Sequence, residues 1–132
     1  MNIQVKSLLF GLTALVAMSF VSTTAARWEL LGARKIDHQL DRDEIIITRS
    51  EGVFSALKLK IKRSPINMHK MAIHFGNGEV QEIDMRTRFA AGSESRLIDL
   101  PGNRRTIQKV VFWYDTKNLA IGKGLVELWG RH

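Results

Sequence analysis

The segment Leu57–Lys62 alternates strictly between apolar and basic residues, and this feature most constrains the fold of the chain. A period of two places every second side chain on the same face of an extended strand, so one face is buried and the other is exposed to solvent. After residue 26, no segment keeps the apolar spacing of an amphipathic helix over three turns. The pattern therefore predicts a chain of strands and turns.

Four other segments have the composition of strands. Val110–Tyr114 is apolar on both faces, as expected of a central strand, and Glu44–Arg49 is short, rich in isoleucine and followed by a turn. Trp28–Ile36 and Gly124–Trp129 are expected to be the first and last strands. Turns at intervals of about 8–12 residues predict an antiparallel β-sandwich or a jelly-roll-like domain of about eight strands.

Two further expected strands, Met71–Phe75 and Gln81–Met85, meet at a glycine-rich turn, and the alternation of their side chains favours one register. A two-residue turn would bury two carboxylates of the second strand, at a cost of several kcal/mol. A three-residue loop, Asn77–Glu79, instead places Ile73 opposite Ile83 and Met71 opposite Met85. We therefore expect the longer loop, although Asn-Gly favours two-residue turns.

Residues 1–26 have the pattern of an export signal. Lys6 provides a short positive region, an uncharged apolar run follows over Leu8–Val21, and small residues in an A-x-A-like pattern end at Ala26. The run is shorter than the about 20 apolar residues of a membrane span, although a retained anchor is the alternative. We expect a cleaved signal peptide over 1–26 and a single β-sandwich domain over 27–132. The product is then periplasmic or secreted, without a stable membrane anchor.

The chain is basic and contains no cysteine. Removal of residues 1–26 removes one of its 20 Lys+Arg and none of its 13 Asp+Glu, which leaves 19 against 13, or +6. The lack of cysteine excludes disulfides, thiolate metal sites and a lipid-modified N-terminal cysteine. An excess of positive charge on an exported protein favours an anionic envelope component or an acidic protein as partner.

The sequence contains no recognisable catalytic or cofactor-binding pattern. His69 and His74 are five residues apart, so an unbroken strand places them on opposite faces and only a bulge would let both reach one ion. His38 lies in an acidic stretch that lacks the glycine and final glutamate of a calcium loop, which favours a solvated loop over a cation site. Gly92–Ser95 is not a nucleophile elbow. We therefore expect neither an enzyme nor a cofactor or metal site.

A stripe of basic residues is one candidate for contact with an anionic partner. Its members project from one face of the expected strand about 7 Å apart, and they are Lys58, Lys60 and Lys62, with Arg63 adjacent. The alternative is a mixed-charge solvent face, on which Glu82 and Asp84 of a neighbouring strand neutralise the lysines. Nucleic acid is not expected, because no aromatic residue is interleaved with the bases.

The three tryptophans raise a carbohydrate-binding module as an alternative function, because sugar rings stack on exposed indoles. Trp113 lies in the most apolar segment and is expected in the core. Trp28 and Trp129 are expected to pair the terminal strands. The alternative requires at least one of these indoles to be exposed beside polar side chains.

Residues 95–107 form the most distinctive stretch, S-R-x-I-D-L-x-G-x-x-R-x-I, which an aromatic strand follows. Together with Trp28–Gly32, the turn at 76–78 and the ending Leu128–Gly130, this motif resembles a family of small exported bacterial proteins of unknown function. The resemblance covers residues 28–130. It implies an all-β fold and brings no activity.

Within this motif, Asp99 is expected to point away from the core, close to Arg105 after the Pro101-Gly102 turn. We expect Asp99 and Arg105 to form a structural ion pair, and Arg96 and Arg104 to be the better candidates for contact with a partner. A ligand-facing cluster of the three arginines is the alternative. The sequence thus predicts an exported, non-catalytic protein of the cell envelope with a binding or structural role towards anionic partners.

Overall fold

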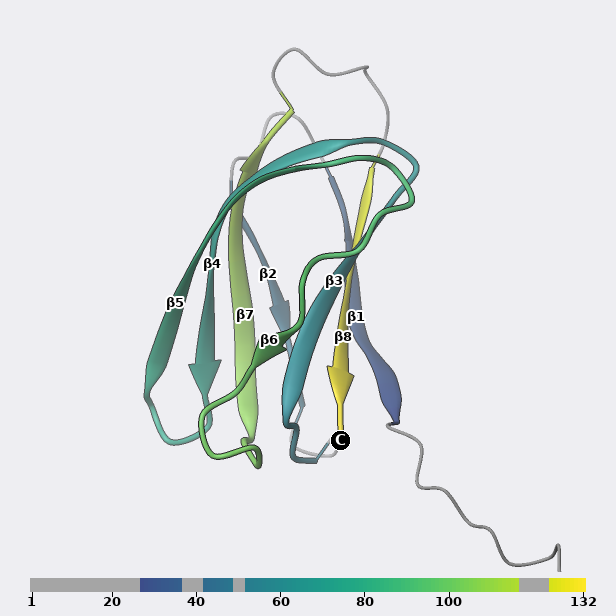
Figure 1. Ribbon diagram of the computed structural model, residues 1–132. Helices are drawn as coiled ribbons and strands as arrows, with labels where there is room; N and C mark the ends of the chain where they lie inside the picture. Colours follow the sequence, from purple (N-terminus) through teal and green to yellow (C-terminus); the bar gives the residue numbers. More distant parts are fainter. Residues whose placement is uncertain (1–26, 37–41, 49–51, 117–123) are drawn as a thin grey trace, which may run out of the picture.

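The computed structural model describes residues 27–36, 42–48, 52–116 and 124–132, and these residues contain strands and no helix. The strands are β1 (Trp28–Lys35), β2 (Arg42–Ile46), β3 (Ala56–Lys62), β4 (Ile66–Phe75), β5 (Val80–Phe89), β6 (Ile98–Asp99), β7 (Ile107–Asp115) and β8 (Leu125–Arg131). They form two antiparallel sheets, the first in the order β1-β8-β3-β6 and the second in the order β2-β7-β4-β5 (Figure 1). The expected β-sandwich is confirmed.

The expected signal peptide, residues 1–26, lies outside the described residues. Within the described ranges there is no helix with the length and apolar character needed to cross a membrane.

The core lies between the inner faces of the two sheets. In β3 the apolar residues Leu57, Leu59 and Ile61 are buried, as the alternation predicts, whereas the lysines between them face outward. In β7, which lies between β2 and β4, Val110–Phe112 has no exposed surface. Each fully buried side chain of this kind contributes about 1.5–3 kcal/mol. Because the chain has no cysteine, this packing holds the fold without covalent cross-links.

The second strand begins earlier in the chain than expected. It covers Arg42–Ile46 rather than Glu44–Arg49, because Arg42 already pairs with Trp113 of β7. Pairing with a long central neighbour therefore sets the bounds of this edge strand more than its own isoleucine content does.

The register expected for the β4–β5 hairpin is wrong by two residues. Met71 pairs with Ile83, and Ile73 pairs with Gln81. Since a shift of two residues preserves the pleat, the expected faces are kept and Ile83 is buried. The loop has the expected length of three residues, but it covers Gly76–Gly78 instead of 77–79.

A glycine conformation explains this register. The Phe75 amide donates to the Glu79 carbonyl at 2.8 Å, and the Gly78 amide donates to the Phe75 carbonyl at 3.0 Å. Gly78 has φ +95°, the left-handed conformation that closes a three-residue hairpin loop. Because glycine adopts this conformation without steric cost, its position in the sequence decides where the loop ends.

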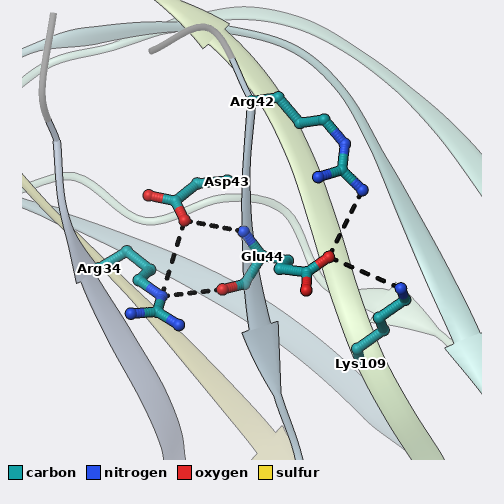
Figure 2. A network of polar contacts seen from close by, with 5 residues as sticks. All are labelled: Arg34, Arg42, Asp43, Glu44 and Lys109. Atoms are coloured by element: carbon teal, nitrogen blue, oxygen red, sulfur yellow. Dashed lines mark hydrogen bonds and ion pairs between the residues drawn. The ribbon is translucent and has the colours of Figure 1, made fainter. Parts of the chain in front are cut away.

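A polar network joins the two sheets at one edge of the sandwich (Figure 2). The Arg34 Nε of β1 donates to the Glu44 carbonyl of β2 at 2.8 Å and lies 3.7 Å from Asp43 Oδ1. The Glu44 carboxylate in turn lies 3.4 Å from Arg42 Nη2 and 3.6 Å from Lys109 Nζ. The acidic residues of β2 are therefore used to hold β1 and β7 against β2.

Candidate functional site

An open pocket of about 660 Å³ lies at the end of the sandwich where the β4–β5 loop, the loop before β7 and the segment before β3 meet. We call it the end pocket. Its lining residues are Gly52, Val53, Phe75, Gly76, Asn77, Arg104, Arg105 and Thr106. It therefore unites the glycine-rich turn at 76–78 with the distinctive motif of residues 95–107.

The motif forms a tight turn that leads into the pocket. Leu100–Asn103 is closed by a hydrogen bond of 3.1 Å from the amide of its last residue to the carbonyl of its first. Gly102 has φ +83°, as the third position of a type II turn requires. Beyond the turn, the Arg105 amide and carbonyl exchange hydrogen bonds with Phe54 at 2.9 and 2.8 Å. The backbone of the pocket is thus fixed to the segment that precedes β3.

The Arg105 side chain ties the two loops together. Its Nη2 lies 2.7 Å from Glu79 Oε1, and its Cζ lies 3.8 Å from the centroid of the Phe75 ring. Only 18% of the side chain is exposed. A guanidinium that stacks on a ring and binds a carboxylate is held in one orientation, so this side chain acts as a support of the pocket.

The structure replaces the expected Asp99–Arg105 pair with two other pairs. The Asp99 carboxylate lies 3.9 Å from Arg131 Nη2, because both residues flank Ala56 of β3 in the sheet register. Arg105 meets Glu79 instead, which the hairpin of the second sheet brings to it. The contact depends on tertiary structure and not on proximity in the sequence.

Glu79 is held in its ionised form. A hydrogen bond of 2.6 Å from Asn77 Nδ2, followed by the hydrogen bond and charge of Arg105, keeps the pKa of the Glu79 carboxyl below its ordinary value of 4.5. At neutral pH this carboxylate therefore neutralises much of the Arg105 charge.

Arg104 is the cation that remains available in the end pocket. It is exposed, and it forms no ion pair or hydrogen bond with another described residue. The polar side chains of Asn77 and Thr106 line the same pocket. This arrangement offers a charged donor and two neutral donors to a ligand that carries a negative group.

We expect Arg105→Ala to lower the free energy of unfolding by about 1–2 kcal/mol, because it removes both the packing on Phe75 and the hydrogen bonds between the loops. Glu79→Ala should cost less in the Arg105→Ala background than in the wild type. Asp99→Ala is the control, and its cost should be much smaller, since that side chain is 75% exposed. Urea denaturation of the Arg105 and Glu79 variants, of the double variant and of the control measures these four free energies of unfolding. Strict additivity of the Glu79 and Arg105 substitutions would contradict the assignment.

The lysine stripe of β3 is paired with acidic residues around its own sheet. Lys58 and Lys60 lie 3.3 and 3.9 Å from the two carboxylate oxygens of Glu94, and Lys62 Nζ lies 4.0 Å from Glu127 Oε1. Glu94 is placed by a bridge between β3 and the segment before β6. The stripe is therefore a mixed-charge surface rather than a row of free cations.

The acidic residues expected to neutralise the lysines lie elsewhere. Glu82 and Asp84 belong to β5 in the second sheet, where they pair with basic residues of β4 and β5. Arg96 Nη2 donates to the Asp84 carbonyl at 3.4 Å. Arg63 is exposed after the end of β3 that lies away from the end pocket. The candidate arginines are therefore distributed over the molecule, and Arg104 is the one in the end pocket.

All three tryptophans are half-buried on the outer faces of the sheets, with a lysine over each ring. The distances from Nζ to the ring centroid are 4.3 Å for Lys58 on Trp28, 4.3 Å for Lys60 on Trp129 and 4.4 Å for Lys70 on Trp113. The expectation of a core position for Trp113 is wrong, because in β7 its neighbours on both sides along the chain take the inward positions. Trp28 and Trp129 lie on the paired terminal strands β1 and β8, as expected.

The histidines do not gather at one site. The register of β4 shifts around His69, whose Nε2 lies 2.6 Å from Asp115 Oδ2. His74 lies farther along β4, where it pairs with Lys109 of β7. Among the described residues there is no group of three or more histidine, aspartate and glutamate side chains that could hold a metal ion. His38 and the other residues of 37–41 lie outside the described residues.

Sequence reasoning missed Phe75, Gly76 and Thr106 as parts of one site. The turn at 76–78 and the motif were both visible in the sequence, but their proximity depends on the pairing of β4 with β7. The two strands are antiparallel neighbours, so the end of β4 lies beside the start of β7, and the Gly76 amide donates to the Thr106 carbonyl at 2.8 Å.

The chain is similar to a protein family and to solved structures. A family model described as a domain of unknown function (DUF2541) matches residues 8–130. AlgX of Pseudomonas aeruginosa is similar in structure, with a TM-score of 0.52 at 10% identity, over 78% of this chain and 27% of that chain. The SPBc2 prophage-derived protein YomS gives a TM-score of 0.40 at 17% identity, over 86% of this chain and 100% of that chain. No curated protein matches this chain. This chain thus spans about a quarter of AlgX, and the likeness concerns the fold alone.

Proposed function

The chain belongs to the DUF2541 family, and because the description of that family assigns no function, we propose one from the end pocket. The protein is an exported, non-catalytic binding protein of the cell envelope. Its end pocket binds an oxyanion, either a carboxylate or a phosphate, that belongs to an envelope component or to an acidic protein. The observation that carries this proposal is the guanidinium of Arg104, which pairs with no other described residue, beside an Arg105 that Glu79 already neutralises.

The export part of the proposal is supported by the sequence. The basic residue, the apolar run and the small residues of 1–26 follow the order of a secretory signal, and the family match begins at residue 8, the first residue of the apolar run. A product with an excess of positive charge would meet anionic surfaces in the periplasm or outside the cell.

The binding part is supported by the chemistry of the pocket. The side chains of Arg104, Asn77 and Thr106 offer hydrogen-bond donors, and hydrogen bonds to an oxyanion are roughly twice as strong as neutral ones. The eight described residues that line the pocket include no histidine, aspartate, glutamate or cysteine. A group suited to act as general base is therefore not among them, which favours binding over catalysis.

Titration with inorganic phosphate tests the proposal. We expect Arg104→Ala to weaken phosphate binding by about tenfold or more, which corresponds to the loss of one charge-assisted hydrogen bond. The melting temperature should stay near that of the wild type, because Arg104 supports no other described residue. Calorimetric titration at about 0.15 M salt measures the affinity.

The matched control is Arg88→Ala, which removes another exposed arginine that forms no ion pair with a described residue. Arg88 lies near the end of β5 that is remote from the β4–β5 loop. The control should leave phosphate binding unchanged. Equal losses in both variants would show a general effect of net charge and would overturn the pocket assignment.

Carbohydrate binding is the second candidate function, since all three indoles are partly exposed beside lysines. The ammonium group over each ring covers one of its faces, which is why the oxyanion proposal ranks first. A titration with cellobiose, a neutral disaccharide, separates the two. Binding of cellobiose that persists in about 1 M salt and is lost in Trp129→Ala would favour the carbohydrate function.

A further inference from the structure

We propose that the outer face of the first sheet docks the protein onto a lipid surface with anionic headgroups. This surface is separate from the end pocket, and the proposal does not depend on what that pocket binds. We call the surface the Trp–Lys face. It consists of Trp28, Leu30, Lys58, Lys60, Trp129 and Arg131.

Three neighbouring strands bring apolar and basic side chains into one row of this face. Leu30 of β1 pairs with Trp129 of β8, which pairs with Lys58 of β3. Leu30 lies in the regular part of β1, before the register shift between Leu30 and Gly32, and is 46% exposed, whereas Leu31 is buried. The alternation of the strand therefore places an exposed aliphatic side chain beside an indole.

A lysine lies over each of the two indoles of the face. Lys58 Nζ lies 4.3 Å from the ring centroid of Trp28, and Lys60 Nζ lies 4.3 Å from that of Trp129. The Trp129 Nε1 donates to Glu127 Oε1 at 3.0 Å, which fixes the orientation of the ring. Tryptophan and lysine are suited to the headgroup region, because each has an apolar body and a polar tip.

The face keeps an excess of positive charge. Lys58 and Lys60 share the single carboxylate of Glu94, whereas Arg131 is paired with Asp99. Arg27 and Lys35, at the two ends of β1, are exposed and form no ion pair with another described residue. Basic residues close to an anionic leaflet are attracted to it, so this charge complements phosphatidylglycerol-type headgroups.

The position of the face in the chain points to the same partner. Trp28 follows Val21, the last residue of the apolar run, by seven positions, and seven extended residues span at most about 25 Å. A run of this kind enters the membrane during export. The Trp–Lys face is therefore delivered next to a lipid surface.

An exposed aliphatic residue favours lipid over a glycan as the occupant, because hydroxyl-rich sugars leave Leu30 without an apolar partner. The other sheet provides an internal comparison. There Trp113 lies in a row between Arg42 and Lys70, with cations 5.7 and 4.4 Å from its ring, and without an exposed aliphatic residue in that row. The row of Trp113 thus presents the same cation–aromatic contact without an aliphatic neighbour, since the exposed Ile46 of that sheet pairs with Lys109 instead.

Co-sedimentation with vesicles tests the proposal on residues 27–132, which contain every described strand and the whole described core. The vesicles are phosphatidylcholine alone, or phosphatidylcholine with about a third of phosphatidylglycerol. We expect binding to the anionic vesicles, a blue shift of the tryptophan fluorescence and release at about 1 M salt. Lys58→Gln and Lys60→Gln should each weaken partition about fivefold, and Leu30→Ser should abolish the blue shift.

Lys70→Gln is the matched control, because it removes the lysine over Trp113 on the other face, and it should leave partition unchanged. Arg104→Ala should also bind vesicles like the wild type. No binding to anionic vesicles, or equal losses in the Lys60 and Lys70 variants, would overturn the proposal. Loss of vesicle binding in Arg104→Ala would move the lipid contact to the end pocket. Binding of a soluble polygalacturonate without vesicle binding would assign the face to glycans, against this proposal.

Discussion

Replacement of Phe112 with alanine will lower the free energy of unfolding by about 3–5 kcal/mol, a large part of the about 5–15 kcal/mol that stabilises a small domain. Phe112 has no exposed surface, and it lies on β7, inside the second sheet, where it pairs with Met71. Its ring centroid is 5.9 Å from that of Tyr114, so truncation leaves a cavity beside another large side chain. The shift of the urea midpoint measures the loss.

Ile46→Ala is the control for this substitution. Ile46 belongs to β2, the strand beside β7, but 61% of it is exposed, so its truncation should cost less than about 1 kcal/mol. A loss for Phe112→Ala as small as that of the control would mean that the two sheets do not pack as the structure describes.

Gly130→Ala is expected to cost about 1–3 kcal/mol, although it adds a single methyl group. A Cβ at this position would lie 2.8 Å from Leu31 Cδ1 and 2.8 Å from Phe54 Cδ1. Because β8 lies between β1 and β3, it cannot shift away without breaking hydrogen bonds on one side. The same urea denaturation measures this effect.

A double substitution separates overpacking from other causes. Leu31→Ala removes one of the side chains that the new methyl group would meet, so Gly130→Ala should cost less in that background than in the wild type. An equal loss of unfolding free energy in both backgrounds would show that a clash with Leu31 is not the cause of the destabilisation.

The sequence predicts which face of each strand is buried better than it predicts which residues pair. The alternation predicted for Leu57–Lys62 holds in β3, because burial of every second side chain is a local pattern. The β4–β5 register is off by two residues, since a shift by two keeps every side chain on its face. It was decided by the left-handed conformation of Gly78, and two glycines flank Asn77 in the sequence without indicating which one takes it.

Ion pairs and ring contacts were the least predictable features. The partners of Lys58 and Arg105 are Glu94 and Glu79, which are distant from them in the sequence. Likewise, Trp113 lies between fully buried residues in an apolar strand, but it faces outward, where the cations of Arg42 and Lys70 contact its ring. Such contacts depend on how two sheets are stacked and paired, which no local pattern specifies.

Assignment of amide chemical-shift changes during titration with inorganic phosphate tests the central claim most directly. The proposed oxyanion site predicts changes concentrated at residues 76–79 and 103–106 that disappear in Arg104→Ala and persist in Arg88→Ala. Changes concentrated instead along the lysines of β3, or no change at any phosphate concentration, would contradict the claim that the end pocket binds an oxyanion.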